Sequence, residues 1–501
     1  MSQHIQLNPE ALKELRTINP RLVSYNVEMT EVTGGTFWKA YTDAQIDGLE
    51  PVPAPDFSKG IAAMHQWYDP IDSTNPRLIK LAKELGEAWV RVSGTWATKT
   101  YYDFEGKGEA PEGYQNRLTK EQWINLLDFV KAVNGKLLIS VANCQGLHSA
   151  EEPWNPSQAE QIFALSAEHG VPIHAVEFTN EPNMMEGTGF PKGYTPAHFR
   201  RDQDLFHKWV REQYPDCMIV GPCTCDPEAL RSDKDDSSGG AGIADIMPSC
   251  TTGDLMDGCT EKLDVFSYHY YNGISDRMAA LMPSMYSPES EAMSESYLGM
   301  AGMCARAFAP YRDKYCPGGE MWVTESGDAG AGGHAWASTY LEVPRALNEL
   351  GDFATVTNGV IFHNTLASSD YGYLKHGSFD PRPSYFAVLL WNRLMGQTVY
   401  ATGEPLREGA HVYAHSRKDG KEGAAYLILN TSWTDVTTVE LPKDAEVYAL
   451  TGNGKMRSRT MLLNGRELVL SENDELPCLC GEPVKAGTLE IAPGSCTFIV
   501  L

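Results

Sequence analysis

Eight short apolar segments follow one another between about residues 20 and 395, separated by longer helix-like stretches. Each segment is nearly continuous in apolar residues, which is typical of parallel strands covered by helices outside and by packed side chains inside. Eight β/α units in succession predict a (β/α)8 TIM barrel, an α/β fold whose active site lies at the carboxyl ends of the strands. The predicted strands are residues 22–29, 89–94, 136–143, 175–182, 218–223, 264–272, 321–327 and 359–367.

Helix boundaries between these strands carry local signals. Residues 119–122 (TKEQ) and 157–160 (SQAE) both match a capping box, in which a hydroxyl and a carboxyl or amide group satisfy the first free N–H groups of a helix. Gly170 follows the second of these helices and is expected to end it. The helices are therefore predicted to begin where the barrel pattern needs them.

The pattern changes after residues 383–396, which read as the eighth helix. Short alternating strands follow at residues 411–417, 424–430, 446–452 and 496–501, and Asn464-Gly465 is a hairpin turn signal. We expect a catalytic barrel over residues 21–396 and a C-terminal β-sandwich domain over residues 397–501. The first 20 residues are expected to join the sandwich.

The charge balance limits the partners of this chain. Its 41 basic and 66 acidic residues leave a net charge of −25, which opposes binding to nucleic acid and to densely sulfated polysaccharide. No apolar run is long enough to span a bilayer, and the N-terminus lacks the pattern of a signal peptide. We expect no membrane partner and a cytoplasmic location as the sequence stands, although a trimmed secreted or periplasmic chain would look the same.

The 11 cysteines do not indicate a disulfide framework, because their number is odd and they are scattered through a long chain. Cys223 and Cys225, like Cys478 and Cys480, are separated by a single residue, which is shorter than the usual spacing of zinc ligands. No metal site is expected. The acidic, glycine-rich stretch 231–245 is predicted to be a long loop.

Two predicted strands end on an acid. Glu181 ends the fourth, in 179–182 (TNEP), and Glu325 ends the seventh. A polar loop after a buried strand would explain either acid alone. Both strand ends face the same mouth, however, and retaining glycosidases need two carboxyl groups about 5–5.5 Å apart. Asn180 is then placed to bond a sugar 2-hydroxyl.

These motifs resemble the catalytic motifs of clan A glycoside hydrolases. More narrowly, the chain is similar to glycoside hydrolase family 79, the heparanases and β-glucuronidases. The segments that carry this resemblance cover the barrel almost from end to end, whereas the sandwich fits the family by position and pattern. They are residues 91–103, 153–170, 267–273 and 366–399, the last being the most specific.

The resemblance implies a role for several residues. Glu181 matches the acid/base and Glu325 matches the nucleophile. Tyr385 matches a tyrosine that contacts the glucuronate carboxylate, Tyr270 matches a tyrosine near the nucleophile, and Glu28 stands where an acid touches sugar hydroxyls.

The same resemblance implies that backbone N–H groups of the loop 327–334 also meet the glucuronate carboxylate. The donors would come from Ala331, Gly332 and Gly333. The loop departs from the animal heparanase pattern, because Gly330 stands where an aromatic residue is found and Ala331 where a glycine is found. Backbone donors survive such changes, but the path of the loop is open.

Structural roles compete with some of these assignments. Tyr268 and Tyr270 alternate to one face of their strand, so lining the barrel would explain them. His269 is expected to point to the other face as a satisfied core histidine. Tyr385 lies near a helix start, where an aromatic side chain usually packs.

The expected function is a retaining, exo-acting β-D-glucuronidase that needs no cofactor and acts on glucuronides or on oligosaccharides containing glucuronic acid. An endo-β-glucuronidase of heparanase or hyaluronidase type, or another clan A activity such as β-xylosidase or β-glucosidase, remains an alternative. A carbohydrate-binding protein on an inactive barrel is a third. The loops around the mouth decide between exo and endo cleavage.

Overall fold

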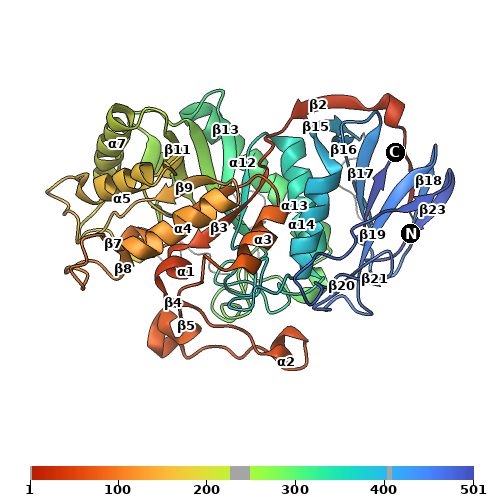
Figure 1. Cartoon of the computed structure of the whole chain (residues 1–501), viewed down its shortest axis with the longest axis horizontal. Helices are drawn as coiled ribbons and strands as arrows, with labels where there is room; N and C mark the ends of the chain where they lie inside the picture. Colours follow the sequence, from red (N-terminus) through yellow and green to blue (C-terminus); the bar gives the residue numbers. More distant parts are fainter. Residues whose placement is uncertain (1–2, 226–248, 403–408) are drawn as a thin grey trace.

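The computed structural model describes residues 3–225, 249–402 and 409–501, so the loop predicted at 231–245 lies outside the described residues. Eight parallel strands close into a barrel in the order β3-β6-β9-β10-β11-β12-β13-β14, which forms the left part of the molecule in Figure 1. The predicted barrel is confirmed. Its strands are β3 Val23–Glu28, β6 Trp89–Ser93, β9 Lys136–Ser140, β10 Ala175–Glu177, β11 Met218–Thr224, β12 Val265–Tyr271, β13 Glu320–Gly327 and β14 Ile361–His363.

A helix lies between each strand and the next, as a β/α barrel requires. The capping box predicted at Thr119 forms, because the Thr119 hydroxyl accepts from the N–H of Gln122 and the Gln122 amide accepts from the N–H of Thr119. The box predicted at Ser157 is wrong, since Pro156 already occupies the N-cap and Ser157 begins the helix. The helices are α3 Pro76–Glu84, α4 Lys120–Ala132, α5 Ser157–Glu168, α7 Pro196–Gln213, α10 Thr252–Met256, α12 Met300–Tyr315, α13 Glu342–Val356 and α14 Pro383–Leu394.

A long insertion separates β3 from α3 and projects from the barrel at the bottom of Figure 1. It contains α1 Met29–Thr33, the antiparallel pair β4 Gly35–Trp38 and β5 His65–Tyr68, and α2 Asp43–Ile46. Arg459 of the C-terminal region anchors it through ion pairs of 2.7 Å to both Asp43 and Asp47. The insertion is thereby held across the mouth of the barrel.

The C-terminal region consists of two sheets, which form the right part of Figure 1. The larger sheet has the order β2-β15-β16-β17-β24-β19-β20-β21, and the smaller has the order β1-β18-β23. Helix α13, almost entirely buried, lies between the barrel and this region. The strands are β1 His4–Gln6, β2 Lys13–Thr17, β15 Met395–Ala401, β16 His411–Arg417, β17 Ala424–Leu429, β18 Thr437–Leu441, β19 Ala445–Gly452, β20 Met461–Leu463, β21 Arg466–Glu467, β22 Glu482–Val484, β23 Gly487–Ile491 and β24 Cys496–Val500.

This region confirms the predicted β-sandwich, and Asn464-Gly465 forms the turn between β20 and β21. The first residues of the chain contribute strands to it, since β1 pairs with β18 and β2 pairs with β15. Cys478 and Cys480 form a disulfide that the sequence pattern did not predict. No helix in the described parts of the chain is long and apolar enough to cross a bilayer.

Candidate active site

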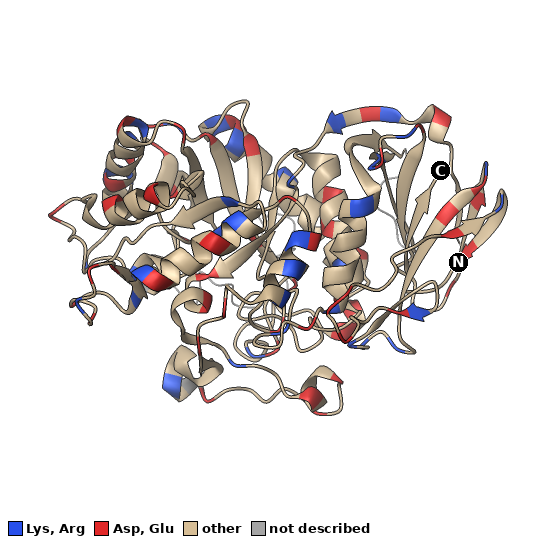
Figure 2. Cartoon of the chain, viewed as in Figure 1, with Lys and Arg blue, Asp and Glu red and all other residues tan. Residues whose placement is uncertain are grey.

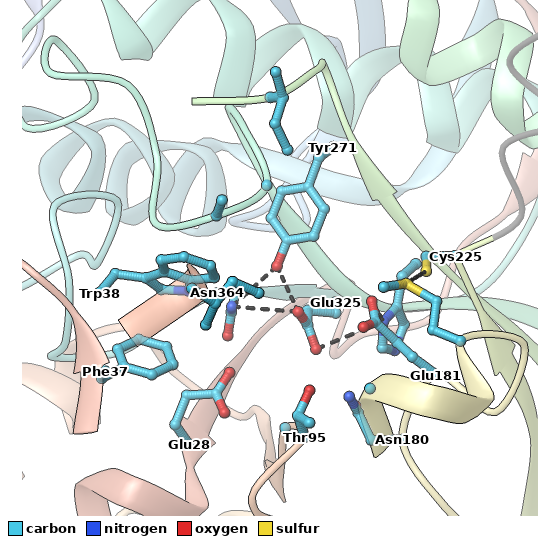
Figure 3. Close-up of a pocket in the computed structure, with 18 of the residues that line it drawn as sticks. Glu28, Phe37, Trp38, Thr95, Asn180, Glu181, Cys225, Tyr271, Glu325 and Asn364 are labelled. Atoms are coloured by element: carbon cyan, nitrogen blue, oxygen red, sulfur yellow. Dashed lines mark hydrogen bonds and ion pairs between the residues drawn. The ribbon is translucent and has the colours of Figure 1, made fainter. Parts of the chain in front are cut away.

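Glu181 and Glu325 face each other in the mouth of the barrel (Figure 3). Glu181 follows the end of β10 in a left-handed backbone conformation with a φ of 44°, which a residue other than glycine keeps only where its surroundings enforce it. Glu325 lies within β13. One carboxylate oxygen of each residue and one ring nitrogen of His269 all lie within 4.8 Å of one another. The structure therefore brings together the two acids that the sequence pairs.

Arg91 of β6 is fully buried near the two acids and contacts three of the polar residues around them. Its Nε donates to Glu177 Oε2 at 3.0 Å, its Nη2 donates to Asn180 Oδ1 at 2.8 Å, and its Nη1 lies 3.4 Å from Glu325 Oε2. A buried charge requires such partners. Sequence reasoning did not assign Arg91 to the catalytic pair, although a charged residue inside an apolar strand was a usable signal.

Asn180 lines the cavity with its amide nitrogen directed toward the carboxyl pair (Figure 3). Its Oδ1 is occupied, because it accepts from Arg91 and, at 3.2 Å, from the Ser93 hydroxyl. The Nδ2 donor is left for a ligand. This is the orientation that a contact to a sugar 2-hydroxyl requires.

His269 lies between the two acids, and its placement corrects the expected core role. Arg91 Nη2 can only donate, so His269 Nε2 accepts from it at 3.2 Å. The proton is then on Nδ1, which donates to Glu181 Oε1 at 2.9 Å. Burial lowers the pKa of His269 to about 4, so the ring is neutral at ordinary pH.

Tyr271, not Tyr270, is the tyrosine at the nucleophile position. The Tyr271 hydroxyl donates to Glu325 Oε1 at 2.6 Å, and Asn364 Nδ2 lies 3.0 Å from the same hydroxyl. Tyr270 instead faces the helices outside the barrel, and its buried hydroxyl has no partner among the described residues. The expected face of β12 was wrong, since Tyr268 also points outward and stacks on Phe308 of α12.

Burial is the main reason why Glu181 can hold a proton. Desolvation raises the pKa of the Glu181 carboxyl above its ordinary value, opposed by the Cys225 thiol and by the Arg91 charge. Desolvation is thus the largest effect on this carboxyl. A carboxyl group with a raised pKa beside a second carboxylate is the arrangement that general acid catalysis needs.

Glu28 lies at the end of β3 and lines the same cavity, as predicted. Burial, followed by the charges of Glu325 and Glu31, raises its pKa well above the ordinary value. Gly94 makes room for it, because a Cβ atom on Gly94 would lie 1.7 Å from Glu28 Oε2. Gly94 also has a φ of 89°, so both space and backbone conformation require glycine there.

The loop after β13 reaches the cavity through Gly330 and Ala331. Ala331 has a φ of 62°, a conformation that favours glycine, which explains why a glycine fits this position in the family pattern. The N–H groups of Ala331 and Gly332 bond to no acceptor in the described part of the chain. The N–H of Gly333 donates to Ala329 O at 3.1 Å. Contrary to the prediction, Gly333 is therefore not a free donor.

Arg277 fixes this loop from behind. Its Nη1 donates to the carbonyls of Ala331 and Gly333 at 3.2 and 3.1 Å, and its Nη2 pairs with Asp370 at 3.0 Å. A trans peptide directs its N–H away from its C=O. The Gly332 N–H therefore points away from Arg277.

Tyr385 does not reach the cavity, which corrects its predicted contact with a sugar carboxylate. It is fully buried near the start of α14, and its hydroxyl donates to Leu81 O of α3 at 2.8 Å. The tyrosine packs two helices together. Tyr371, which does line the cavity and lies 3.1 Å from Asn364 Nδ2, occupies the mouth instead.

The cavity has a volume of about 530 Å³, which is the size of a small-ligand site. The oxygens of Glu181 and Glu325 with His269 Nδ1 form the one cluster of possible metal-ligand atoms in the described ranges. His269 Nδ1 and Glu181 Oε1 already serve each other as donor and acceptor. The arrangement supports acid-base chemistry without requiring an ion.

Comparison with curated proteins finds relatives along most of the chain. Heparanase-like protein 1 of Arabidopsis thaliana is 24% identical over 86% of this chain and 85% of its own. A hyaluronoglucuronidase of Hirudo nipponia is 24% identical over 86% of this chain and 90% of its own. Baicalin-beta-D-glucuronidase of Scutellaria baicalensis is 30% identical over 48% of this chain and 46% of its own. No protein-family model matches the sequence.

Solved structures support the barrel fold. A 4-O-alpha-L-rhamnosyl-beta-D-glucuronidase from Fusarium oxysporum superposes with a TM-score of 0.62 at 12% identity, covering 99% of this chain and 100% of its own. The relatives of similar sequence confirm the resemblance to glycoside hydrolase family 79, and the solved structure agrees with the barrel fold. The chain is a glycoside hydrolase related to the heparanases and β-glucuronidases.

Proposed function

We propose that the protein is a retaining, exo-acting β-D-glucuronidase. The observation that carries the retaining mechanism is the spacing of Glu181 and Glu325, whose nearest oxygens lie within 4.8 Å. Inverting enzymes separate their carboxyls by about 6.5–9.5 Å to leave room for water, whereas retaining enzymes keep them about 5–5.5 Å apart. The spacing favours direct attack by a carboxylate.

In the first step Glu325 attacks the anomeric carbon. The glycosidic C–O bond breaks, and the proton of Glu181 passes to the leaving oxygen. In the second step Glu181 takes a proton from water, whose oxygen displaces Glu325 from the anomeric carbon and gives β-glucuronic acid. Tyr271 and Arg91, both bonded to Glu325, hold it in the attacking position.

Recognition of the glucuronate carboxylate rests on the loop after β13. The free N–H groups of Ala331 and Gly332 supply donors that a carboxylate can accept, and Arg277 keeps their peptides oriented. A neutral 6-hydroxymethyl group would accept weaker hydrogen bonds from the same donors. This favours a glucuronide over the matching glucoside or xyloside.

A terminal sugar fits the shape of the mouth better than an internal one. Phe37 and Trp38 of the insertion line the cavity on the side of Glu28 (Figure 3), and His65, which also lines it, packs against Trp38. Trp38 closes against Gly332, where an added Cβ would lie 2.5 Å from it. These three side chains leave little room for a further sugar beyond the glucuronate.

The test compares 4-nitrophenyl β-D-glucuronide with the corresponding glucoside and xyloside. We expect kcat/KM to be highest for the glucuronide, and a proton NMR time course to show β-glucuronic acid before its α-anomer. Equal kcat/KM on the three sugars would overturn the proposed specificity. Appearance of the α-anomer first would overturn the retaining mechanism.

A further inference from the structure

One half of the barrel mouth is lined by four methionines. Met184 follows β10, while Met278, Met282 and Met285 follow β12, and all four line the cavity. We call them the methionine wall. Cys225, which follows β11, extends this surface, since its sulfur lies 3.2 Å from Met184 Sδ.

The order of the strands places the methionine wall on the side of Glu181 and away from Glu28, while its segment after β12 adjoins the loop after β13 through a hydrogen bond from the Ser275 N–H to Gly330 O. Strands β10, β11 and β12 are neighbours in the barrel, and β13, β14 and β3 follow them on the other side. Glu28, Ala331 and Tyr371 belong to that second half. Figure 3 shows Cys225 beside Glu181, across Glu325 from Glu28.

Glu181 identifies which part of a substrate meets the methionine wall. A general acid must reach the oxygen that joins the sugar to its leaving group. Glu181 stands in the same half of the mouth as the methionine wall, at the end of β10. The leaving group therefore lies against the methionines while the glucuronate lies toward Glu28.

The chemistry of this half is apolar. The described residues that line it from the loops after β10, β11 and β12 include no charged side chain beyond Glu181 itself. Thioethers are polarisable, adapt their shape and make favourable contacts with aromatic rings. Lys99, which follows β6, also lines the cavity; its side chain packs against Gly189 of the loop after β10 and its ammonium group lies over the Trp96 ring.

We infer that the methionine wall is the binding site for the leaving group, and that it selects glucuronides whose aglycone is an uncharged, apolar ring system. An anionic aglycone would lose its hydration against the thioethers without gaining a partner from them. The inference rests on the proposed glucuronidase activity and deepens it by naming the substrate class.

The test uses two 7-hydroxycoumarin glucuronides of similar phenol acidity, one with a 4-methyl group and one with a 4-sulfomethyl group. We expect the wild-type protein to favour the neutral substrate by about tenfold or more in kcat/KM. Met278→Lys should lower kcat/KM for the neutral substrate about tenfold and narrow the gap between the two. Met278→Leu, which keeps an apolar side chain of similar volume, should preserve the preference.

β-D-Glucuronyl fluoride serves as the control, because it has the same sugar but no organic aglycone. Its kcat/KM should stay within about twofold in both variants if Met278 acts only on the leaving group. Equal wild-type rates on the two coumarins, or an equal loss on the fluoride, would overturn the inference. Failure to hydrolyse any glucuronide, with activity on another β-glycoside, would instead remove the proposed function and this inference with it.

Discussion

His269 Nδ1 lies 2.9 Å from Glu181 Oε1 while its Nε2 accepts a hydrogen bond from Arg91. The neutral histidine therefore links the buried Arg91 side chain to Glu181 and fixes the position of the acid. A donor such as the Nδ1–H favours the charged form of the carboxylate that accepts from it, so this contact acts against the burial that raises the pKa of Glu181. The histidine orients Glu181 without exchanging protons itself, since its own pKa is about 4. The contact predicts a change in the pH profile.

His269→Leu should raise the pKa of Glu181 further, because it removes the N–H donor. Glu181 must be protonated to act as the acid, so activity falls as pH rises through its pKa, and the basic limb of kcat/KM should move to higher pH. His269→Asn keeps an amide donor near the position of Nδ1 and is the matched control. A basic limb that stays in place in His269→Leu would contradict the role assigned to this contact.

The two acids should respond differently to removal of charge. Glu325→Gln should abolish formation of the glycosyl-enzyme on every substrate, since the attacking oxygen is lost. Glu181→Gln should lower kcat/KM strongly for poor leaving groups and much less for activated aryl glucuronides, which depart without a proton. A plot of log kcat against leaving-group pKa distinguishes the two variants. Equal residual activity of both on an activated substrate would contradict the roles assigned to the two acids.

Tyr271→Phe and Tyr270→Phe form a matched pair on adjacent positions. Losing the hydrogen bond from Tyr271 to the Glu325 carboxylate should cost about 1.5–3 kcal/mol of transition-state stabilisation, seen in kcat/KM. Tyr270→Phe removes a buried hydroxyl that has no partner among the described residues, so activity should stay the same and unfolding free energy should not fall. Denaturant unfolding and kinetics on the same preparations would measure both effects.

Gly94→Ala should reduce activity by displacing the Glu28 carboxyl group. The added methyl group would lie 1.7 Å from Glu28 Oε2 and must displace that carboxyl from the cavity. Gly86→Ala provides the control for backbone strain, because Gly86 has a similar φ of 86° but nothing within 4 Å of its Cβ position. Both variants should lose about 1 kcal/mol of stability, whereas only Gly94→Ala should lose most of its kcat/KM; equal kinetic losses would show that strain alone is responsible.

The barrel was predictable because its signals are local and repeated. Apolar runs, turn residues and the Thr119 cap all lie within a few positions of the element they specify. The face of β12 was not predictable, since a barrel strand is buried on both sides and alternation in 268–271 gives two faces without saying which one is inside. Arg91 was missed for a different reason: its partners Glu177 and Glu325 are far away in sequence and meet it only when the barrel closes.

Tyr385 shows the limit of carrying a role over from a motif. Its sequence context matches the family pattern, but the face of α14 that carries it packs on α3 and leaves the cavity to other side chains. Helix rotation is set by packing on both neighbours, which the local motif does not contain.

The net charge of −25 predicts a preference among substrates of different length. In the view of Figure 2, acidic and basic residues are mixed along the described elements. Charges interact over about 8–10 Å at physiological salt, so a long sulfated chain feels this repulsion along its length while a small glucuronide does not. We expect release of glucuronic acid from small glucuronides to exceed internal cleavage of heparan sulfate, and added salt to raise only the polymer rate. Size-exclusion chromatography of digests checks this, and a rapid fall in heparan sulfate chain length at low salt and low enzyme concentration would show that a local groove outweighs the overall charge.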